Sequence, residues 1–494
     1  MSKFFKPVSS GKATLILSAA TVLSYGLGLV RDLMLSYYFG ASSEMDAYNT
    51  AFLIPDLIFN FTIAAALASV FLPTFRDAYL KNREDGEKLA GSFLVVSQIV
   101  VVMVAALSYV FMPFLVKIIF GHAELLQQEK IILYSRIMLV SPILFGISNT
   151  LGVIAMSFKH YLSYALSPGI YNIGIIFGIY FWGNEHGVLG AIYGVVIGLF
   201  LHLGIRFFDL RKIQDFKIQF ELFHKNVGEI FLTSFPRSFG LMVWQFNAWI
   251  YNVVGYSLAV GSISAFNYAK NLQSFAVSLF GISVATAVFP YIVDFKSRSE
   301  HENLVKKIEH TFLQILLFTV PSAIGLYVLD LQAVDFLFGR GEFASQGASV
   351  ATASILMFLA LAIPFESLSH LISRIYYAHK NTWIPVLINF GFLGINLIGC
   401  LLFADRFGAS IFGISFLIGS VFQISLLCFF VRKYVSLNWK KLGLESLKIV
   451  LASCVMGLAV NYLQFLPFLI NVLCGVFIYA VLLWKSTLKY FVKK

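Results

Sequence analysis

The sequence predicts an all-α integral membrane protein of about fourteen transmembrane helices, forming two pseudo-symmetric six-helix lobes and a further C-terminal pair. Three observations support this fold class. Of the 494 residues 59% are hydrophobic and only 12% are charged, about half the charged fraction of a soluble domain. Many apolar segments reach the roughly 20 residues that cross a bilayer. Two of these segments resemble each other although more than two hundred residues separate them.

The apolar segments predict the individual spans. These are residues 13–38, 47–75, 90–117, 131–157, 161–182, 187–208, 229–257, 262–294, 308–329, 349–375, 381–404, 409–431, 446–464 and 466–486. The first resembles a signal peptide, but it runs on into Arg31 and Asp32 without a small-residue cleavage site, so we interpret it as a span. The last two are short and share a turn around Pro467.

Basic residues predict the orientation. With the N-terminus inside, the inward loops carry Arg76, Lys81, Arg83, Lys88, Lys159, Arg206, Arg211, Lys212, Lys217, Lys225, Lys296, Arg298, Lys306, Lys307, Arg374, Lys380, Arg432, Lys433, Lys440 and Lys441. The outward loops carry only Lys117, Lys130, Arg340 and Arg406. This is the positive-inside bias, so we expect both termini in the cytoplasm. The bias also explains most of the net charge of +11. No nucleic-acid partner is needed to explain this basic charge.

An internal repeat indicates a transporter. Residues 265–269 (AFNYA) resemble residues 47–51 (AYNTA), and residues 285–290 (ATAVFP) resemble residues 68–73 (ASVFLP). An even number of predicted crossings separates the copies, so they point the same way. Parallel repeats of this kind build transporters whose halves move against each other around a central site.

The repeat and the polar stretches divide the chain. We predict a first lobe over 1–208, a cytoplasmic amphipathic linker over 209–228, a second lobe over 229–433 and a final helix pair over 434–494. The cysteines lack the spacing of disulfides or zinc ligands, and we expect no metal site. The four cysteines are Cys400, Cys428, Cys454 and Cys474.

Ionisable residues inside spans are candidates for function because each costs roughly 2.5–3.5 kcal/mol to insert. Arg31 and Asp32 lie past the middle of the first span. Neighbours on a helix do not face each other, so we expect no simple ion pair. One side chain would face a cavity and the other would brace the helix. The alternative is a pair that snorkels to the outer interface.

Two further cations lie in the predicted second lobe. Lys270 and Asn271 lie deep in the eighth span among amide side chains, which suggests a hydrated wall. The alternative is a lysine paired with Asp56 or Glu366. Arg237 follows a proline early in the seventh span, and the alternative to a functional role is snorkelling to the cytoplasmic interface.

Acidic residues next to prolines are candidates for ion coupling. Asp56 and Asn60 lie one turn apart after Pro55, and Glu366 and His370 lie one turn apart after Pro364. Either pair could relay protons or bind a cation. The alternative is hydrogen bonding to the helix backbone or within the core. Arg374 is expected to anchor its span at the inner interface.

The balance of deep charges favours an anionic substrate. Deep cations equal deep acids in number, whereas a pump for cationic drugs would need an acidic cavity. Arginine and lysine suit phosphate or pyrophosphate, because charge-assisted hydrogen bonds to these groups are strong.

Several motifs resemble the MurJ/MviN family, the lipid II flippases of the multidrug/oligosaccharidyl-lipid/polysaccharide exporter superfamily. They are residues 28–32 (GLVRD), 39–41 (FGA), 46–47 (DA), 51–55 (AFLIP), 71–73 (FLP), 245–247 (QFN), 338–343 (FGRGEF) and 371–378 (LISRIYYA). The resemblance covers nearly the whole chain. It implies fourteen helices, two lobes, and a C-terminal helix pair that forms a groove for a lipid tail.

The resemblance also implies roles for single residues. The family's cavity arginine matches Arg31, and two family acids match Asp32 and Asp46, which we expect to be structural or gating residues together with Arg374. Asn60 stands where many members have arginine.

Other positions also depart from the family pattern. Lys270-Asn271 replaces an Asp-Arg pair, Tyr25 replaces an arginine, and Tyr251 and Cys400 occupy the positions of the acids that form a sodium site in some members. Arg31 and Lys270 remain the main expected substrate anchors, with Arg237, Asn271 and Asn60 as further candidates.

The sequence therefore predicts a flippase, not an enzyme, in the bacterial cytoplasmic membrane. It would move a lipid-linked peptidoglycan precursor of the undecaprenyl-pyrophosphate type by alternating access. We expect a monomer in contact with membrane lipids and without a cofactor; the coupling cation, H⁺ or Na⁺, stays open. Alternatives are a flippase for another polyprenyl-pyrophosphate-linked glycan, a cation-coupled drug antiporter that uses Asp56 or Glu366, and a non-transporting scaffold.

Overall fold

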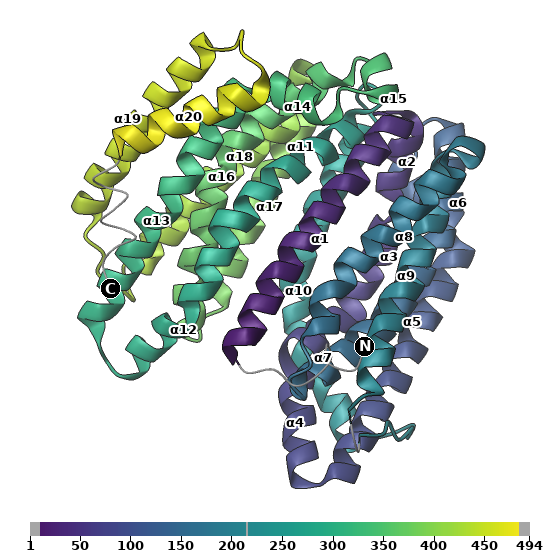
Figure 1. Cartoon of the computed structure of the whole chain (residues 1–494). Coiled ribbons are helices and arrows are strands. Elements are labelled where there is room, and N and C mark those ends of the chain that lie inside the picture. Colours follow the sequence, from purple (N-terminus) through teal and green to yellow (C-terminus); the bar gives the residue numbers. More distant parts are fainter. Residues whose placement is uncertain (1–9, 214–215, 484–494) are drawn as a thin grey trace. The chain divides into compact units, whose positions relative to one another are not determined.

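The structure, a computed structural model, describes residues 10–213 and 216–483, and every regular element in these ranges is helical (Figure 1). The predicted fold class is confirmed. Contacts group the chain into two units, Met1–Gly261 with Gly341–Phe343 and Ser262–Arg340 with Ala344–Lys494. The predicted domain boundaries follow the repeat, not the contacts, and they stay a prediction.

The first unit is built from long helices and one broken segment. Its elements are α1 (Ser10–Phe39), α2 (Ser43–Ala51), α3 (Leu53–Phe59), the π-helical turns η1 (Asn60–Ala64) and η2 (Leu67–Phe71), α4 (Leu72–Lys81), α5 (Arg83–Phe120), α6 (Leu125–Met138), α7 (Val140–Ser157), α8 (Leu162–His186), α9 (Val188–Leu210) and α10 (Lys225–Gly255). Helix α8 lies between α1 and α9 and packs against both of them (Figure 1).

The second unit repeats this plan and adds a helix hairpin. Its elements are α11 (Ser262–Ala276), η3 (Val277–Ile282), α12 (Ser283–Ser297), α13 (His301–Val328), α14 (Asp330–Phe338), α15 (Gly341–Ser345, which begins in the residues grouped with the first unit), α16 (Ala348–Ala378), α17 (Trp383–Phe407), α18 (Ser410–Val431), α19 (Trp439–Tyr462) and α20 (Phe468–Leu482). The α19–α20 hairpin packs against α13, where Tyr479 donates to the Leu317 carbonyl at 2.8 Å.

Glycines allow α8 and α9 to pack backbone to backbone. A Cβ atom at Gly174 would lie 2.3 Å from the Cα of Gly198, and one at Gly178 would lie 2.4 Å from the Cα of Gly194. Small residues spaced four apart are how membrane helices approach closely, because dispersion and not the hydrophobic effect drives their association. This pair forms a rigid wall against which α1 packs through α8.

The described residues contain ten helices that are long and apolar enough to cross a membrane, by length and composition. The other four predicted spans fall on α1, on the broken segment α2–α4, on α10 and on the short apolar α20. The count of fourteen stays a prediction. The predicted single span 47–75 is interrupted at Phe52, where one helix ends and the next begins.

The two copies of the repeat share an irregularity that the sequence does not reveal. The offset of 218 residues between Ala47 and Ala265 carries η1 onto residues 278–282, which form all but the first residue of η3. A π-helical turn widens the helix and frees backbone groups, and such turns are frequent at functional sites. The repeat therefore extends from sequence to local backbone geometry.

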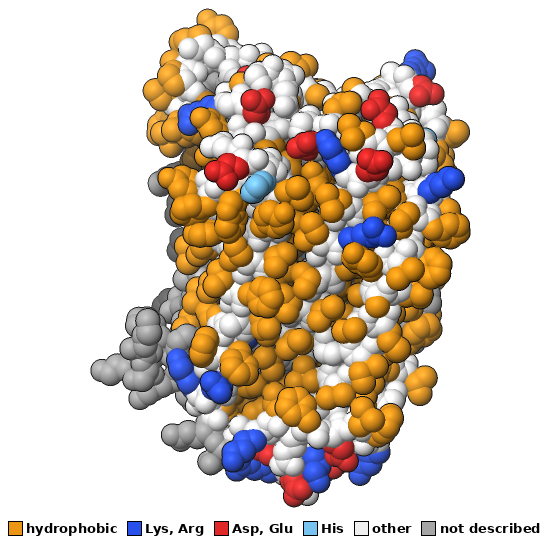
Figure 2. All heavy atoms as spheres, turned by 90° about the vertical axis from the view of Figure 1, so that its right-hand side faces the viewer, with side chains coloured by type: hydrophobic (Ala, Val, Ile, Leu, Met, Phe, Trp, Pro, Cys, Tyr) orange, Lys and Arg blue, Asp and Glu red, His pale blue; other side chains and the backbone are white. Residues whose placement is uncertain are grey.

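Side-chain distribution agrees with a membrane protein. On the face drawn in Figure 2, hydrophobic side chains cover a broad middle band, and most charged side chains gather toward its two ends. Each unit also encloses its own cluster of buried apolar residues. Charged groups are placed where they can reach water, as the bilayer requires.

Candidate functional site

Arg31 lies on α1 and binds a carboxylate and an amide. Its Nη2 and Nε atoms donate to Asp32 Oδ1 at 2.7 and 3.0 Å, and its Nη1 donates to Asn172 Oδ1 at 3.0 Å. The expectation that Arg31 and Asp32 form no ion pair is therefore wrong. Neighbouring Cβ atoms point apart, but the long arginine side chain folds back along the helix and reaches the carboxylate.

Asn172 was not predicted as part of this site. It is buried on α8, and its own amide donates to the Ser24 carbonyl at 3.4 Å, so it ties α8 to α1 and orients the guanidinium. The signal for it is weak: one amide in an apolar span, four residues after Pro168. The Arg31 side chain keeps 25% of its surface exposed, whereas that of Asp32 keeps only 8%. The cation is thus held in place and still accessible.

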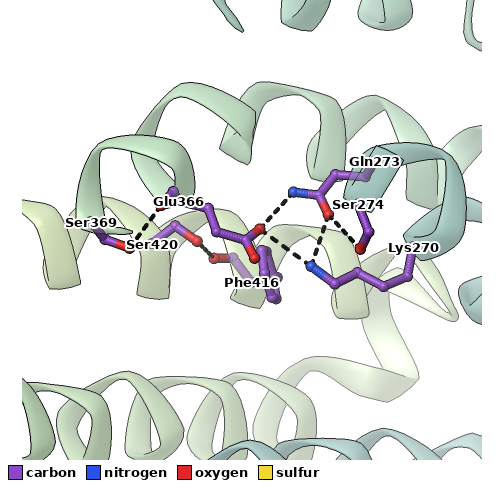
Figure 3. A network of polar contacts seen from close by, with 7 residues as sticks. All are labelled: Lys270, Gln273, Ser274, Glu366, Ser369, Phe416 and Ser420. Atoms are coloured by element: carbon purple, nitrogen blue, oxygen red, sulfur yellow. Dashed lines mark hydrogen bonds and ion pairs between the residues drawn. The ribbon is translucent and has the colours of Figure 1, made fainter. Parts of the chain in front are cut away.

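Lys270 on α11 forms the second cation site, shown in Figure 3. Its Nζ donates to Gln273 Oε1 at 2.8 Å and to Glu366 Oε2 at 3.3 Å, and it lies 4.0 Å from the ring centroid of Phe416. The alternative pairing of Lys270 with a carboxylate is thereby confirmed, with Glu366 as the partner. Its side chain is 23% exposed.

The Glu366 carboxylate is held by two donors from α11, Lys270 and Gln273. Gln273 donates to the same Oε2 atom at 2.7 Å, and Ser369 donates to the Glu366 carbonyl at 2.7 Å (Figure 3). Three helices, α11, α16 and α18, therefore meet at one network. Phe416, whose ring binds the ammonium group by a cation–π contact, was missed because an aromatic residue in an apolar span carries no signal of its own.

The candidate coupling residues make separate contacts. The hydrogen bonds of the Glu366 carboxylate in the described chain go to Gln273 and Lys270, and none goes to His370. Asp56 lies close to the side chain of Gln245 from α10. Asn60 donates to the Asp56 carbonyl at 2.9 Å, at the start of η1. Asn60 thus hydrogen-bonds the helix backbone, which is the alternative that the sequence analysis gave for this residue.

Asp46 joins α2 to the segment after α10. Its Oδ2 atom accepts a hydrogen bond of 2.7 Å from the backbone N–H of Gly261, and the carboxylate is buried. Gly261 has φ +86°, and a Cβ atom there would lie 2.0 Å from the Ala41 carbonyl oxygen, so only glycine fits. Nearby, Thr50 contacts Asn252 at 2.9 Å and Tyr256 at 3.0 Å. A structural role for Asp46 fits this geometry.

The remaining predicted residues lie elsewhere. Arg374 donates to Thr286 at 2.7 Å and lies over the ring of Phe289 at 5.3 Å, so it holds the repeated motif at residues 285–290. Asn271 is exposed on α11. Arg237 belongs to α10, but its side chain lies outside the described residues.

Arg206 corrects one part of the orientation argument. The sequence predicts it as a loop residue, but it is buried near the end of α9. It donates to Asn149 at 2.7 Å and to Ser167 at 2.9 Å, and one turn on Asp209 accepts from His160 at 3.0 Å. This charge is satisfied inside the first unit and supports packing.

The two cation sites share a chemical design. Each places one partly exposed cation against one better buried carboxylate and one amide, inside helices that are otherwise apolar. A ligand with several anionic oxygens could replace the carboxylate at the cation, because charge-assisted hydrogen bonds gain strength where water is scarce. The described residues contain no cluster of three His, Cys, Asp or Glu side chains that could hold a metal.

Comparison with solved structures defines the class of protein. The fold matches a MATE-family multidrug resistance transporter of the MOP superfamily in an inward-facing conformation, with a TM-score of 0.69 at 15% identity over 85% of this chain and 98% of that one. At this identity the likeness concerns the fold. The described residues thus form a helical protein with ten candidate membrane spans and the same fold as that transporter.

The particular family follows from closer relatives. The family model "Lipid II flippase MurJ" matches residues 35–480, and the chain belongs to this family. A probable lipid II flippase MurJ of Thermotoga maritima is 30% identical over 96% of both chains. The lipid II flippase MurJ of Thermosipho africanus is 28% identical over 95% of both. A solved lipid II flippase MurJ in an inward closed conformation matches with a TM-score of 0.83 at 25% identity, over 97% of this chain and 100% of that one.

Proposed function

We propose that this protein moves lipid II across the bacterial cytoplasmic membrane by alternating access. Membership of the lipid II flippase family is the observation that carries the proposal. The proposed reaction is transport, in which no bond is broken. The repeat with matched π-helical turns supports two halves that change their relative orientation during the cycle.

Arg31 and Lys270 are the proposed pyrophosphate ligands. Both cations are accessible, and both are bound by a carboxylate that the pyrophosphate would replace. The exchange keeps each cation paired with an anion in the membrane, where an unpaired cation would be costly. Arg237, Asn271 and Asn60 are proposed as secondary contacts, and the α19–α20 pair as the groove for the lipid tail.

Complementation tests this proposal. A bacterium depleted of its own lipid II flippase is supplied with the chain, and the lipid II accessible on the outer leaflet is measured. Arg31→Ala should lower this amount at least roughly tenfold, since it removes charge-assisted hydrogen bonds worth about 1.5–3 kcal/mol. Arg136→Ala is the matched control, because Arg136 contacts Tyr109 and belongs to neither cation network.

Each outcome has a meaning. Rescue by the wild type and by Arg136→Ala, but not by an equally expressed Arg31→Ala, supports the flippase and its anchor. Equal rescue by Arg31→Ala removes this residue from the binding site. Failure of a well-expressed wild type in two different hosts overturns lipid II as the substrate. Mass spectrometry of co-purified lipids then identifies any other polyprenyl-pyrophosphate-linked glycan.

We further propose that both termini face the cytoplasm, that the protein acts as a monomer, and that H⁺ or Na⁺ resets the carrier. Asp56, Glu366 and His370 are the candidate residues for coupling. The two carboxylates are buried or half-buried in the membrane helices. Dependence of the rescue on a proton or sodium gradient, lost in Asp56→Asn, would identify the ion.

A further inference from the structure

The segment that joins α9 to α10 is held against the start of α5. The backbone N–H of Lys217 donates to Glu87 Oε1 at 3.1 Å, and the Gln219 side chain donates to Glu87 Oε2 at 2.9 Å. The Gln219 N–H also donates to the Glu87 carbonyl at 3.3 Å. Gly91 permits this contact, since a Cβ atom there would lie 2.0 Å from the Gln219 carbonyl oxygen. We call residues 216–224 the strap.

The far end of the strap is fixed as well. Ser92 accepts from the His224 N–H at 2.9 Å and donates to the Leu222 carbonyl at 3.3 Å, and the His224 ring lies 3.2 Å from Asp85. Contacts at both ends keep the strap in an extended form along α5.

A cavity of about 580 Å³ lies beneath the strap, between α5 and α9, with α7 as its floor. This volume falls within the roughly 300–1,000 Å³ of ligand sites. Its walls are almost wholly apolar, with Leu94, Leu151 and Leu210 from the three helices and Phe216 and Ile218 from the strap. Gln98 from α5 adds an uncharged polar side chain to this lining, which still suits a hydrocarbon chain better than a sugar or a free nucleotide.

One cation marks the rim of this cavity. Arg211 lines it directly after the end of α9, is exposed to solvent, and has its guanidinium 4.8 Å from the ring centroid of Phe207. Phe207 and Phe220 line the cavity and are 44% and 75% exposed. Exposed aromatic rings beside a basic residue are typical of the membrane interface.

We propose that this cavity binds an anionic membrane phospholipid, with an acyl chain beneath the strap and the phosphate at Arg211. The positive-inside bias places this end of the molecule at the cytoplasmic leaflet, whose anionic lipids attract basic residues close to its surface. The lipid complements both the apolar walls and the single cation of the rim. Its residues are separate from the networks of Arg31 and Lys270, so this lipid is a resident ligand and not the transported one.

Native mass spectrometry of the purified full-length protein tests the proposal, with phosphatidylglycerol as the anionic lipid and phosphatidylcholine as the neutral one. The wild type should retain one phosphatidylglycerol in preference to phosphatidylcholine. Arg211→Gln should weaken this binding at least roughly tenfold, the effect of losing one charge-assisted hydrogen bond. Lys212→Gln is the matched control, because it removes the same charge one residue away and does not line the cavity.

Two variants test the cavity itself. Leu151→Trp fills it from the floor and Ile218→Trp from the strap, and either should abolish retention while the protein elutes as a folded species. Equal losses in Arg211→Gln and Lys212→Gln would reduce the effect to general surface charge and overturn the site. Retention of the lipid in a folded tryptophan variant would also overturn it. Transport is not the readout, so these results are independent of the proposed flippase activity.

Discussion

Lys270 shows how a single charge is tolerated inside an apolar helix. Its ammonium group contacts a carboxylate and an amide oxygen, and it lies 4.0 Å from the centroid of an aromatic ring. Each contact alone is too weak to repay desolvation of the charge. Together they make a site that is neutral and still partly open.

We predict that Glu366→Gln destabilises the protein by about 1–3 kcal/mol, since it leaves a mostly buried cation without its anion. The melting temperature of the purified protein measures this. Adding Lys270→Met to Glu366→Gln should restore most of the stability, because the unpaired charge is gone, but should not restore rescue.

Glu302→Gln is the control for that prediction. Glu302 pairs with Lys306 on α13, and both side chains are largely exposed, where ion pairs contribute little. Its melting temperature should equal that of the wild type. If the Glu366→Gln protein has the same melting temperature as the wild type, the ion pair between Lys270 and Glu366 adds nothing to stability.

Sequence reasoning reached the charged residues of the sites but not all of their partners. A charge in an apolar span is conspicuous, so Arg31, Lys270 and Glu366 could be found from the sequence. Asn172 could not, because it contributes only one polar side chain from a helix far along the chain. Partners set by tertiary packing leave no local pattern.

At the scale of elements, Gly91 decides how closely the strap approaches α5. We predict that Gly91→Ala displaces the strap and destabilises the first unit by roughly 1–3 kcal/mol, the usual effect of forcing atoms into a packed contact. Hydrogen exchange of residues 216–224 should increase. The control is Gly204→Ala on α9, where nothing lies within 4 Å of the added carbon and a small gain is expected. Unchanged exchange in Gly91→Ala would contradict the close contact.

The α8–α9 pair carries a second prediction of this kind. Gly178→Ala places a carbon 2.4 Å from the backbone of Gly194, so the helices must separate and the melting temperature should fall. Gly394→Ala, on α17 with open space around it, should melt at or slightly above the wild-type temperature. Equal melting of the two variants would show that the helices separate at no cost.

Sequence patterns predict the long helices but not the irregularities of their backbone. Hydropathy locates apolar segments, so long helices such as α5 and α16 were predicted closely. It does not register how the backbone turns, and the interruption at Phe52 and the turns η1 and η3 were missed. Their common position in the repeat became visible only in the structure.

At the scale of the whole molecule, two similar halves support a transport cycle better than a single rigid bundle does. The repeat relates residues 47–73 to residues 265–290, and each unit carries one cation site of the same design. In such a protein, each half can offer its own cation to a ligand, so that no new site has to form in each state of the transport cycle. For this, both halves must cross the membrane in the same direction, and the number of spans determines that direction.

The topology can be measured in intact cells. In a background where the four native cysteines are replaced by alanine, we predict that Lys117→Cys and Arg406→Cys react with a membrane-impermeant maleimide added outside. Lys212→Cys and Lys433→Cys should react only after the membrane is permeabilised, because the positive-inside bias places them in the cytoplasm. An odd number of spans between α5 and α18 would invert this pattern at Arg406 and Lys433. That outcome would show that the spans of the second lobe do not all repeat those of the first lobe in the same direction, and it would overturn the prediction of two parallel six-helix lobes.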